Sequence, residues 1–104
     1  MRVLAVVPDL MLASRVREGL AAAGHEVDVV SALAADSDAD AVVCDLDAVD
    51  AEAIVATGLP SLGFYSHVDV ETKREAERAG IDLVVPRSRM ARELPELVER
   101  LLSR

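Results

Sequence analysis

Apolar residues occur along this chain in short blocks, which polar or charged residues separate. Five of these blocks are four to six residues long and are rich in Val, Leu and Ile. Blocks of this length and composition are typical of strands that are buried on both faces of a sheet. They predict strands at residues 3–7, 25–30, 41–44, 61–65 and 81–85. The second block alternates in part between apolar and polar residues, which indicates a strand at the edge of the sheet.

The segments between these blocks carry apolar residues at the spacing of an amphipathic helix. Leu12, Val16 and Leu20, for example, recur every four residues and share one helical face. The same spacing predicts helices at residues 10–23, 48–57, 70–79 and 88–102. Residues 31–40 are polar and small, and they predict at most one or two helical turns.

The ends of these helices carry their own signals. Asp9 and Asp69 precede two of the helices, where an Asp side chain accepts hydrogen bonds from free backbone N–H groups. Glycines at positions 24, 58 and 80 suit the left-handed backbone found at a helix end. Pro95 falls inside the last helix. Because proline breaks a helix interior, we expect it to start a second helical segment there.

Strands that alternate with helices predict an α/β fold in three layers. The parallel sheet of five strands is covered by helices on both faces and is connected by right-handed crossovers. We expect the doubly wound strand order 2-1-3-4-5. A chain of 104 residues can form one core and is too short for two. We therefore expect a single domain over residues 1–104.

Composition and charge narrow the classes of function. Aromatic residues make up 2% of the chain, which argues against a surface that stacks on single-stranded nucleic acid. The net charge is −8, and residues 18–71 contain twelve acidic residues but no Lys or Arg. An acidic surface repels phosphate backbones and attracts a cation or a basic partner. We therefore expect no binding to nucleic acid.

Other sequence signals concern location and the roles of single residues. The N-terminal apolar block is too short for a signal peptide or a membrane span, so we expect a soluble cytoplasmic protein without membrane contact. Cys44 is the only cysteine, which excludes an intramolecular disulfide, and its strand position predicts a small core residue. His25 and His67 are predicted to be exposed polar residues rather than ligands.

Polar side chains follow three of the predicted strands. Asp9 follows the first strand, Asp45 and Asp47 end the third, and Ser66 and His67 follow the fourth. Burying Asp45 in the middle of a strand would carry a heavy desolvation cost, so we expect it at the strand end. Strands one and three are neighbours in the predicted order, and ligands bind at such a switch point. The sequence therefore predicts that Asp9 and Asp45 face each other across a crevice, with Ser66 alongside.

This arrangement resembles a response-regulator receiver domain of the CheY-like kind, and the likeness covers essentially the whole chain. The resemblance implies a flavodoxin-like fold and a site that binds magnesium. In that family the aspartate after the third strand takes a phosphoryl group from a histidine kinase. The resemblance implies that Asp45 is the phosphoacceptor. It also implies that Asp9, Asp45 and Asp47 hold the Mg²⁺ ion, with Asp47 offering its backbone carbonyl. It also implies that the hydroxyl group of Ser66 binds the phosphoryl group.

The chain departs from the receiver pattern at two places. The acidic pair after the first strand is reduced to Pro8 and Asp9, so one carboxylate is missing. Val85 stands where the family has a lysine before a proline. Arg87 or Arg89 is a candidate replacement for that lysine. The planar guanidinium group of an arginine, however, does not act like the compact ammonium charge of a lysine.

Three functions follow from these observations. The first is a stand-alone degenerate receiver, or pseudo-receiver, that contacts a protein partner through the helix at 70–79 and the last helix. That partner is a histidine kinase, a downstream effector or a second copy of the chain. The second is a phosphorelay response regulator that accepts phosphate on Asp45 with magnesium. The third is a small-molecule or nucleotide binder, although no glycine-rich loop follows the first strand. We expect a signalling or binding module rather than an enzyme.

Overall fold

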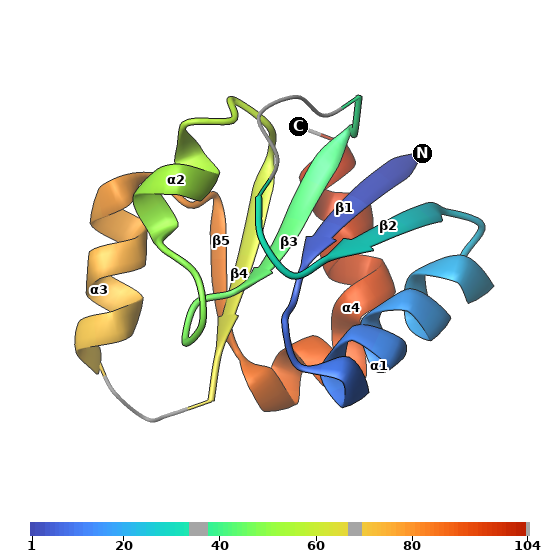
Figure 1. The fold of residues 1–104 in the computed structure, drawn as a ribbon, viewed down its shortest axis with the longest axis horizontal. Helices are drawn as coiled ribbons and strands as arrows, with labels where there is room; N and C mark the ends of the chain where they lie inside the picture. The colour runs from blue at the N-terminus through green and yellow to red at the C-terminus, as the bar shows by residue number, and fades with distance from the viewer. Residues whose placement is uncertain (34–37, 67–69, 104) are drawn as a thin grey trace.

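The computed structural model describes residues 1–33, 38–66 and 70–103. All the strand pairs in this part of the chain are parallel, and the sheet has the order β2-β1-β3-β4-β5. The predicted three-layer α/β fold is therefore confirmed (Figure 1). The strands are β1 (Arg2–Val6), β2 (Glu26–Val30), β3 (Ala41–Asp45), β4 (Ser61–Tyr65) and β5 (Leu83–Pro86). The helices are α1 (Leu10–Ala22), α2 (Ala51–Val55), α3 (Val70–Ala79) and α4 (Arg87–Leu102).

The sheet separates two hydrophobic cores, and successive side chains of each inner strand point into opposite ones. On β1, Val3 and Ala5 pack into the core beneath α1 and α4. Leu4 and Val6 pack into the core beneath α2 and α3. Figure 1 shows the two helix pairs on opposite sides of the sheet. Burial on both faces explains why the inner strands are continuous apolar runs.

The second predicted helix is shorter than its sequence pattern indicates. The pattern predicts a helix at residues 48–57, whereas α2 covers Ala51–Val55. The backbone N–H groups of Ala48 and Val49 both bond the carbonyl oxygen of Asp45, which forms a tight turn after β3. Asp50 then caps α2 by accepting a 3.2 Å hydrogen bond from the backbone N–H of Glu52.

The prediction that Pro95 starts a second helical segment is wrong. α4 is one helix from Arg87 to Leu102, and Pro95 lies inside it. Proline removes one backbone hydrogen bond from a helix interior. The helix nevertheless continues because a buried apolar stripe holds both halves against the core. That stripe consists of Met90, Leu94, Leu97, Val98 and Leu101.

The structure confirms most of the predicted helix ends. Gly24, Gly58 and Gly80 all have positive φ angles after their helices, as the sequence predicts. The predicted cap at Asp69, the residue His67 and the centre of the segment at 31–40 lie outside the described residues. None of the described helices is long and apolar enough to span a membrane.

Candidate functional site

The polar residues singled out by the sequence come together at the carboxyl edge of the sheet. Asp45 is the last residue of β3 and pairs with Phe64 of β4. Ser66 follows the end of β4, and Tyr65 of that strand pairs with Pro86 of β5. Arg87, the first residue of α4, follows directly. The predicted position of this edge is therefore correct.

Asp45 is the buried carboxylate of this edge. The residue is 7% exposed, and its Oδ1 atom accepts a 3.0 Å hydrogen bond from the backbone N–H of Asp47. Burial raises the pKa of Asp45, and the negative charges of Asp47 and Asp9 act in the same direction. The hydrogen bond from Asp47 and the positive charge of Arg87 oppose this rise only in part. The site therefore favours the protonated form of Asp45 more than water does.

The Asp47 side chain reaches across to the loop after β4. Its Oδ2 atom accepts a 2.7 Å hydrogen bond from the backbone N–H of Ser66 and a 2.6 Å bond from the hydroxyl group of the same residue. The structure thus brings Ser66 to the site, as predicted. It also gives the hydroxyl group of Ser66 an acceptor within the chain.

Asp9 has a structural task at the start of α1. Its Oδ1 atom accepts hydrogen bonds of 2.9 Å from the backbone N–H of Met11 and 3.1 Å from that of Leu12. The predicted helix cap is therefore confirmed. The residues between the end of β1 and Asp9 are Val7, which is buried, and Pro8. They leave no other acid between that strand end and Asp9.

The carboxylates of this edge do not form a metal-binding group. Within residues 1–33, 38–66 and 70–103, no three Asp, Glu, His or Cys side chains are placed to hold a metal ion. The Oδ1 atom of Asp9 caps a helix, and the Oδ2 atom of Asp47 bonds Ser66. Hard cations such as Mg²⁺ need several oxygen ligands around one point. Asp45, the second carboxylate oxygen of Asp9 and the backbone carbonyl of Asp47 would be the oxygens left to hold such an ion.

The end of β5 supplies a positive charge from Arg87 but no lysine. Val85 is buried, and Arg87 is close enough to lower the pKa of Asp45. Arg89 instead places its Nε atom 3.3 Å from the Oε2 atom of Glu93, one helical turn further along α4. Of the two arginines that the sequence offered as replacements for a lysine, Arg87 is the one that acts on the site.

The comparisons with known proteins identify the fold. No protein-family model matches this sequence, and no curated protein matches it either. Solved structures do match. A response regulator from Thermotoga maritima is 16% identical with a TM-score of 0.81, covering 99% of this chain and 98% of that one. The non-phosphorylated HemR receiver domain from Leptospira biflexa is 24% identical with a TM-score of 0.81, covering 99% of this chain and 94% of that one.

A further match is HP1043, an orphan response regulator of H. pylori. It is 21% identical with a TM-score of 0.79, covering 98% of this chain and 96% of that one. The chain has the response-regulator receiver fold. At these identities the likeness establishes the arrangement of the strands and helices, and the site has to be judged on its own residues.

Two adjoining cavities open on the side of the receiver fold where α1 meets α4. The first, about 540 Å³, is lined by Arg15, Tyr65, Ser66 and Arg87 together with mostly apolar residues. The second, about 230 Å³, shares Arg15 with it. Sequence reasoning missed Arg15 and Tyr65 as cavity residues. No pattern in the sequence indicates that Arg15 meets the start of a helix more than seventy positions later.

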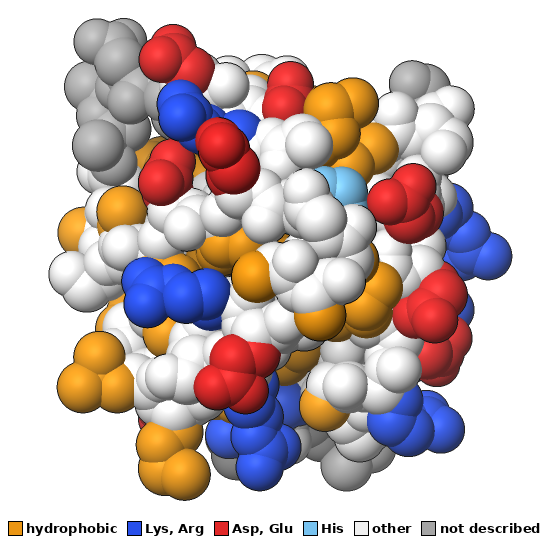
Figure 2. Space-filling view, turned by 90° about the vertical axis from the view of Figure 1, so that its right-hand side faces the viewer, with side chains coloured by type: hydrophobic (Ala, Val, Ile, Leu, Met, Phe, Trp, Pro, Cys, Tyr) orange, Lys and Arg blue, Asp and Glu red, His pale blue; other side chains and the backbone are white. Residues whose placement is uncertain are grey.

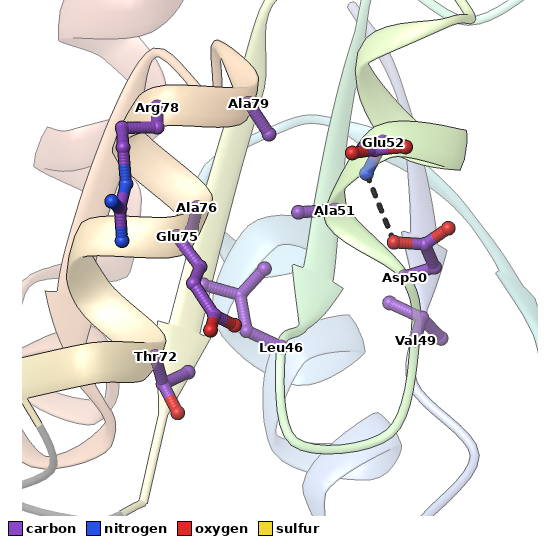
Figure 3. Close-up of a pocket in the computed structure, with 10 residues that line it drawn as sticks. All are labelled: Leu46, Val49, Asp50, Ala51, Glu52, Thr72, Glu75, Ala76, Arg78 and Ala79. Carbon is purple, nitrogen blue, oxygen red and sulfur yellow. Dashed lines mark hydrogen bonds between the residues drawn. The ribbon is translucent and has the colours of Figure 1, made fainter.

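A cleft of about 420 Å³ lies between α2 and α3 on the other side of the receiver fold. Figure 3 shows Leu46 between the two helices, with Glu75 directed toward it from α3. Asp50 and Glu52 line the α2 side, and Arg78 is the basic residue among the ten that line the cleft. Leu46 covers β4 at Gly63, where an added Cβ atom would lie 2.7 Å from its Cδ1 atom.

Two further predictions concern Cys44 and His25. Cys44 is fully buried, and burial together with the charge of Asp45 raises the pKa of its thiol to about 12, so it is a core residue as predicted. The prediction that His25 is exposed is wrong. Its side chain is 5% exposed, and its Nε2 atom lies 3.3 Å from the Oε1 atom of Glu99. Neither ring nitrogen makes a hydrogen bond within the described residues.

Proposed function

We propose that this chain is a signalling module with a degenerate receiver site, and that it acts through contact with a protein partner without accepting phosphate on Asp45. The hydrogen bonds from Ser66 to Asp47 carry this proposal. They use the hydroxyl group that a phosphoryl group would need.

The electrostatics of the site support the same proposal. A carboxylate attacks phosphorus only when it is ionised and when the charge on the phosphoryl oxygens is neutralised. Burial favours the protonated form of Asp45. Arg87 is the basic group whose charge acts on Asp45, and its guanidinium stands in place of the lysine of the receiver pattern. The raised pKa of Asp45 and the arginine in place of a lysine both make phosphate transfer to Asp45 less favourable.

The partner surface in this proposal is formed by α3, the edge strand β5 and the exposed side of α4. α3 buries only Ala76 among its ten residues, so its charged side chains face solvent. On α4, the side chains of Arg89 and Arg92 both lie near Glu93. A surface of mixed charges favours a polar partner whose association weakens as the salt concentration rises. A histidine kinase or a downstream effector could present such a surface, and so could a second copy of the chain.

The experiment is to cross-link the protein to its partner in the source cell and to identify the partner by mass spectrometry. Three forms are compared, namely the wild type, Asp45→Asn and the charge-reversed variant Arg74→Glu on α3. We expect the same partner to be captured by the wild type and by Asp45→Asn, and to be lost or strongly reduced with Arg74→Glu. Loss of the partner with Asp45→Asn alone would contradict the proposal and would favour magnesium-dependent phosphate acceptance on Asp45.

A further inference from the structure

The groove between α1 and α4 is a second feature of the molecule, and it shares Ser66 and Arg87 with the candidate site. It consists of the cavities of about 540 and 230 Å³, which share Arg15, Met90 and Ala91. We call these two cavities together the α1–α4 groove. Ala91 and the neighbouring Gly19 are small, so the two helices leave space where larger side chains would fill it.

The larger part of the groove combines an apolar lining with two arginines. Leu12 and Met90 contribute buried apolar surface, and Tyr65 contributes a half-buried ring. Arg15 and Arg87 line the same space. Binding sites for small molecules commonly have this form, with apolar walls, a few convergent polar groups and a volume of several hundred Å³.

Six of the nine arginines that the structure describes, Arg15 and Arg87 among them, have no carboxylate partner. Arg2, Arg89 and Arg92 each lie within 4 Å of a carboxylate oxygen. Among the residues that the structure describes, neither Arg15 nor Arg87 has a carboxylate oxygen at that distance. A guanidinium group presents a planar fork of donors that matches a carboxylate. The groove therefore offers two cations to a bound anion.

The opposite end of the groove limits the charge of a ligand. Glu18 lines the smaller cavity, next to Gly19 and Pro95. Its carboxylate repels a second negative charge at that end, so the complementary ligand carries its acidic group at one end only. The apolar surface between the two ends, with Tyr65 and Met90, suits an aromatic body because rings and thioethers pack well against one another.

We infer that the α1–α4 groove binds a small aromatic carboxylate, whose acid group is held by Arg15 and Arg87 and whose ring packs against Met90 and Tyr65. The lining of the groove alone supports this inference, which does not rest on the proposed function. Because Arg87 also acts on Asp45 and begins α4, a bound carboxylate would link the groove to the edge of the sheet.

The test uses 2-naphthoate as the ligand and records ¹H–¹⁵N spectra of the whole chain during titration. We expect saturable shifts of the amide signals of Tyr65 and Ala91 with a dissociation constant below about 1 mM. The neutral analogue 2-naphthamide and acetate alone are the controls for the charge and for the ring. Both are expected to bind at least about ten times more weakly.

Matched variants separate the groove from general charge effects. Arg15→Gln and Arg87→Gln are each expected to weaken 2-naphthoate binding about tenfold or more. Arg17→Gln removes an exposed arginine of α1 and is expected to leave the dissociation constant within about twofold. Ala91→Leu, which narrows the groove without a change of charge, is expected to weaken binding too. The amide spectra themselves show whether each variant is folded.

Three results would overturn the inference. The first is the absence of saturable shifts with 2-naphthoate. The second is binding that Arg15→Gln and Arg87→Gln leave unchanged. The third is tighter binding, with the same dependence on the two arginines, by an acidic peptide that contains an aromatic residue, since the groove would then be a docking site for a protein. The cross-linking experiment of the proposed function is independent of all three results.

Discussion

The carboxylate of Asp47 accepts two hydrogen bonds from Ser66, which lies nineteen positions later in the chain. One comes from the backbone N–H at 2.7 Å and the other from the side-chain hydroxyl at 2.6 Å. Asp47 is itself fixed by its backbone N–H, which donates to Asp45. Direct hydrogen bonds among Asp45, Asp47 and Ser66 thus connect the end of β3 to the end of β4.

The link between Asp47 and Ser66 is expected to contribute to stability. Asp47→Ala removes the acceptor and is expected to lower the free energy of unfolding by about 1 kcal/mol, while Ser66→Ala removes only the hydroxyl donor and is expected to cost less. Because the two residues act together, the double variant should cost less than the sum of the single ones. Urea denaturation of the four proteins measures this. Strict additivity would show that the two side chains do not interact in solution.

Asp9 is expected to act as a helix cap and not as a metal ligand. Asp9→Ala removes the acceptor for the N–H groups of Met11 and Leu12 and is expected to destabilise the protein by about 1 kcal/mol. Asp9→Ser keeps a capping oxygen, so its free energy of unfolding should stay within a few tenths of a kcal/mol of the wild-type value. Thermal denaturation with and without magnesium chloride measures both. A large loss in Asp9→Ser, or a magnesium-dependent rise of the melting temperature in the wild type alone, would contradict the capping role.

Asp45 is expected to make stability depend on pH. Its raised pKa means that the folded chain binds this proton more tightly than the unfolded chain. The contribution of protonated Asp45 is complete below the ordinary carboxyl pKa and is lost as the pH rises through the raised value. Asp45→Asn keeps an oxygen for the N–H of Asp47 and removes the charge. It should therefore be more stable than the wild type at pH 7, by roughly 0.5–2 kcal/mol.

The same comparison at low pH is the control for this prediction. Near about pH 4 the wild type holds more of the proton, so the stability difference between wild type and Asp45→Asn should shrink. Denaturation curves of both proteins at the two pH values measure it. If Asp45→Asn were less stable than the wild type at pH 7, the ionised carboxylate would be a stabilising hydrogen-bond acceptor, which would contradict this prediction.

Gly63 is expected to be required by the side chain of Leu46. A Cβ atom at position 63 would lie 2.7 Å from the Cδ1 atom and 2.8 Å from the Cγ atom of Leu46. Gly63→Ala is therefore expected to cost about 1–3 kcal/mol through overpacking. Leu46→Ala introduced in the same chain should restore much of that loss. If Gly63→Ala leaves the melting temperature unchanged, the Leu46 side chain moves aside at little cost. The packing in the cleft between α2 and α3 would then not require glycine at position 63.

The fold could be predicted from the sequence because its signals are local. Each buried strand is a short apolar block, and Gly24, Gly58 and Gly80 mark helix ends by their backbone freedom. Pro95 was misjudged for a physical reason. Local propensity favours a break there, and the burial of Leu94, Leu97 and Val98 outweighs it.

The candidate site could be predicted only in outline. The topology places Asp45, Asp47 and Ser66 at one edge, and the strand order follows from the sequence pattern. The direction of each side chain does not follow from that pattern. The two hydrogen bonds that turn the Asp47 side chain toward Ser66 have no signal in the sequence. The burial of His25 beside Glu99 also depends on packing between distant segments.

Exposed apolar residues near the site are a feature that sequence periodicity left unexplained. Figure 2 shows a face on which some apolar side chains stand out among charged ones. Across the described residues, Leu10 and Met11 at the start of α1 are the most exposed large apolar side chains, at 82% and 75%. They lie beyond the helical stripe of Leu12, Val16 and Leu20, which is buried. Their exposure places apolar surface beside Asp9, near the edge of the sheet.

The central claim is that the edge containing Asp45 does not accept phosphate. The measurement that tests it most directly is the intact mass of the protein after incubation with magnesium chloride and acetyl phosphate. Asp45→Asn and a receiver domain with a complete acidic pair are treated in parallel. We predict an unchanged mass for the wild type and for Asp45→Asn, while the complete receiver gains a phosphoryl group. A phosphoryl adduct on the wild type that is absent from Asp45→Asn would contradict the account.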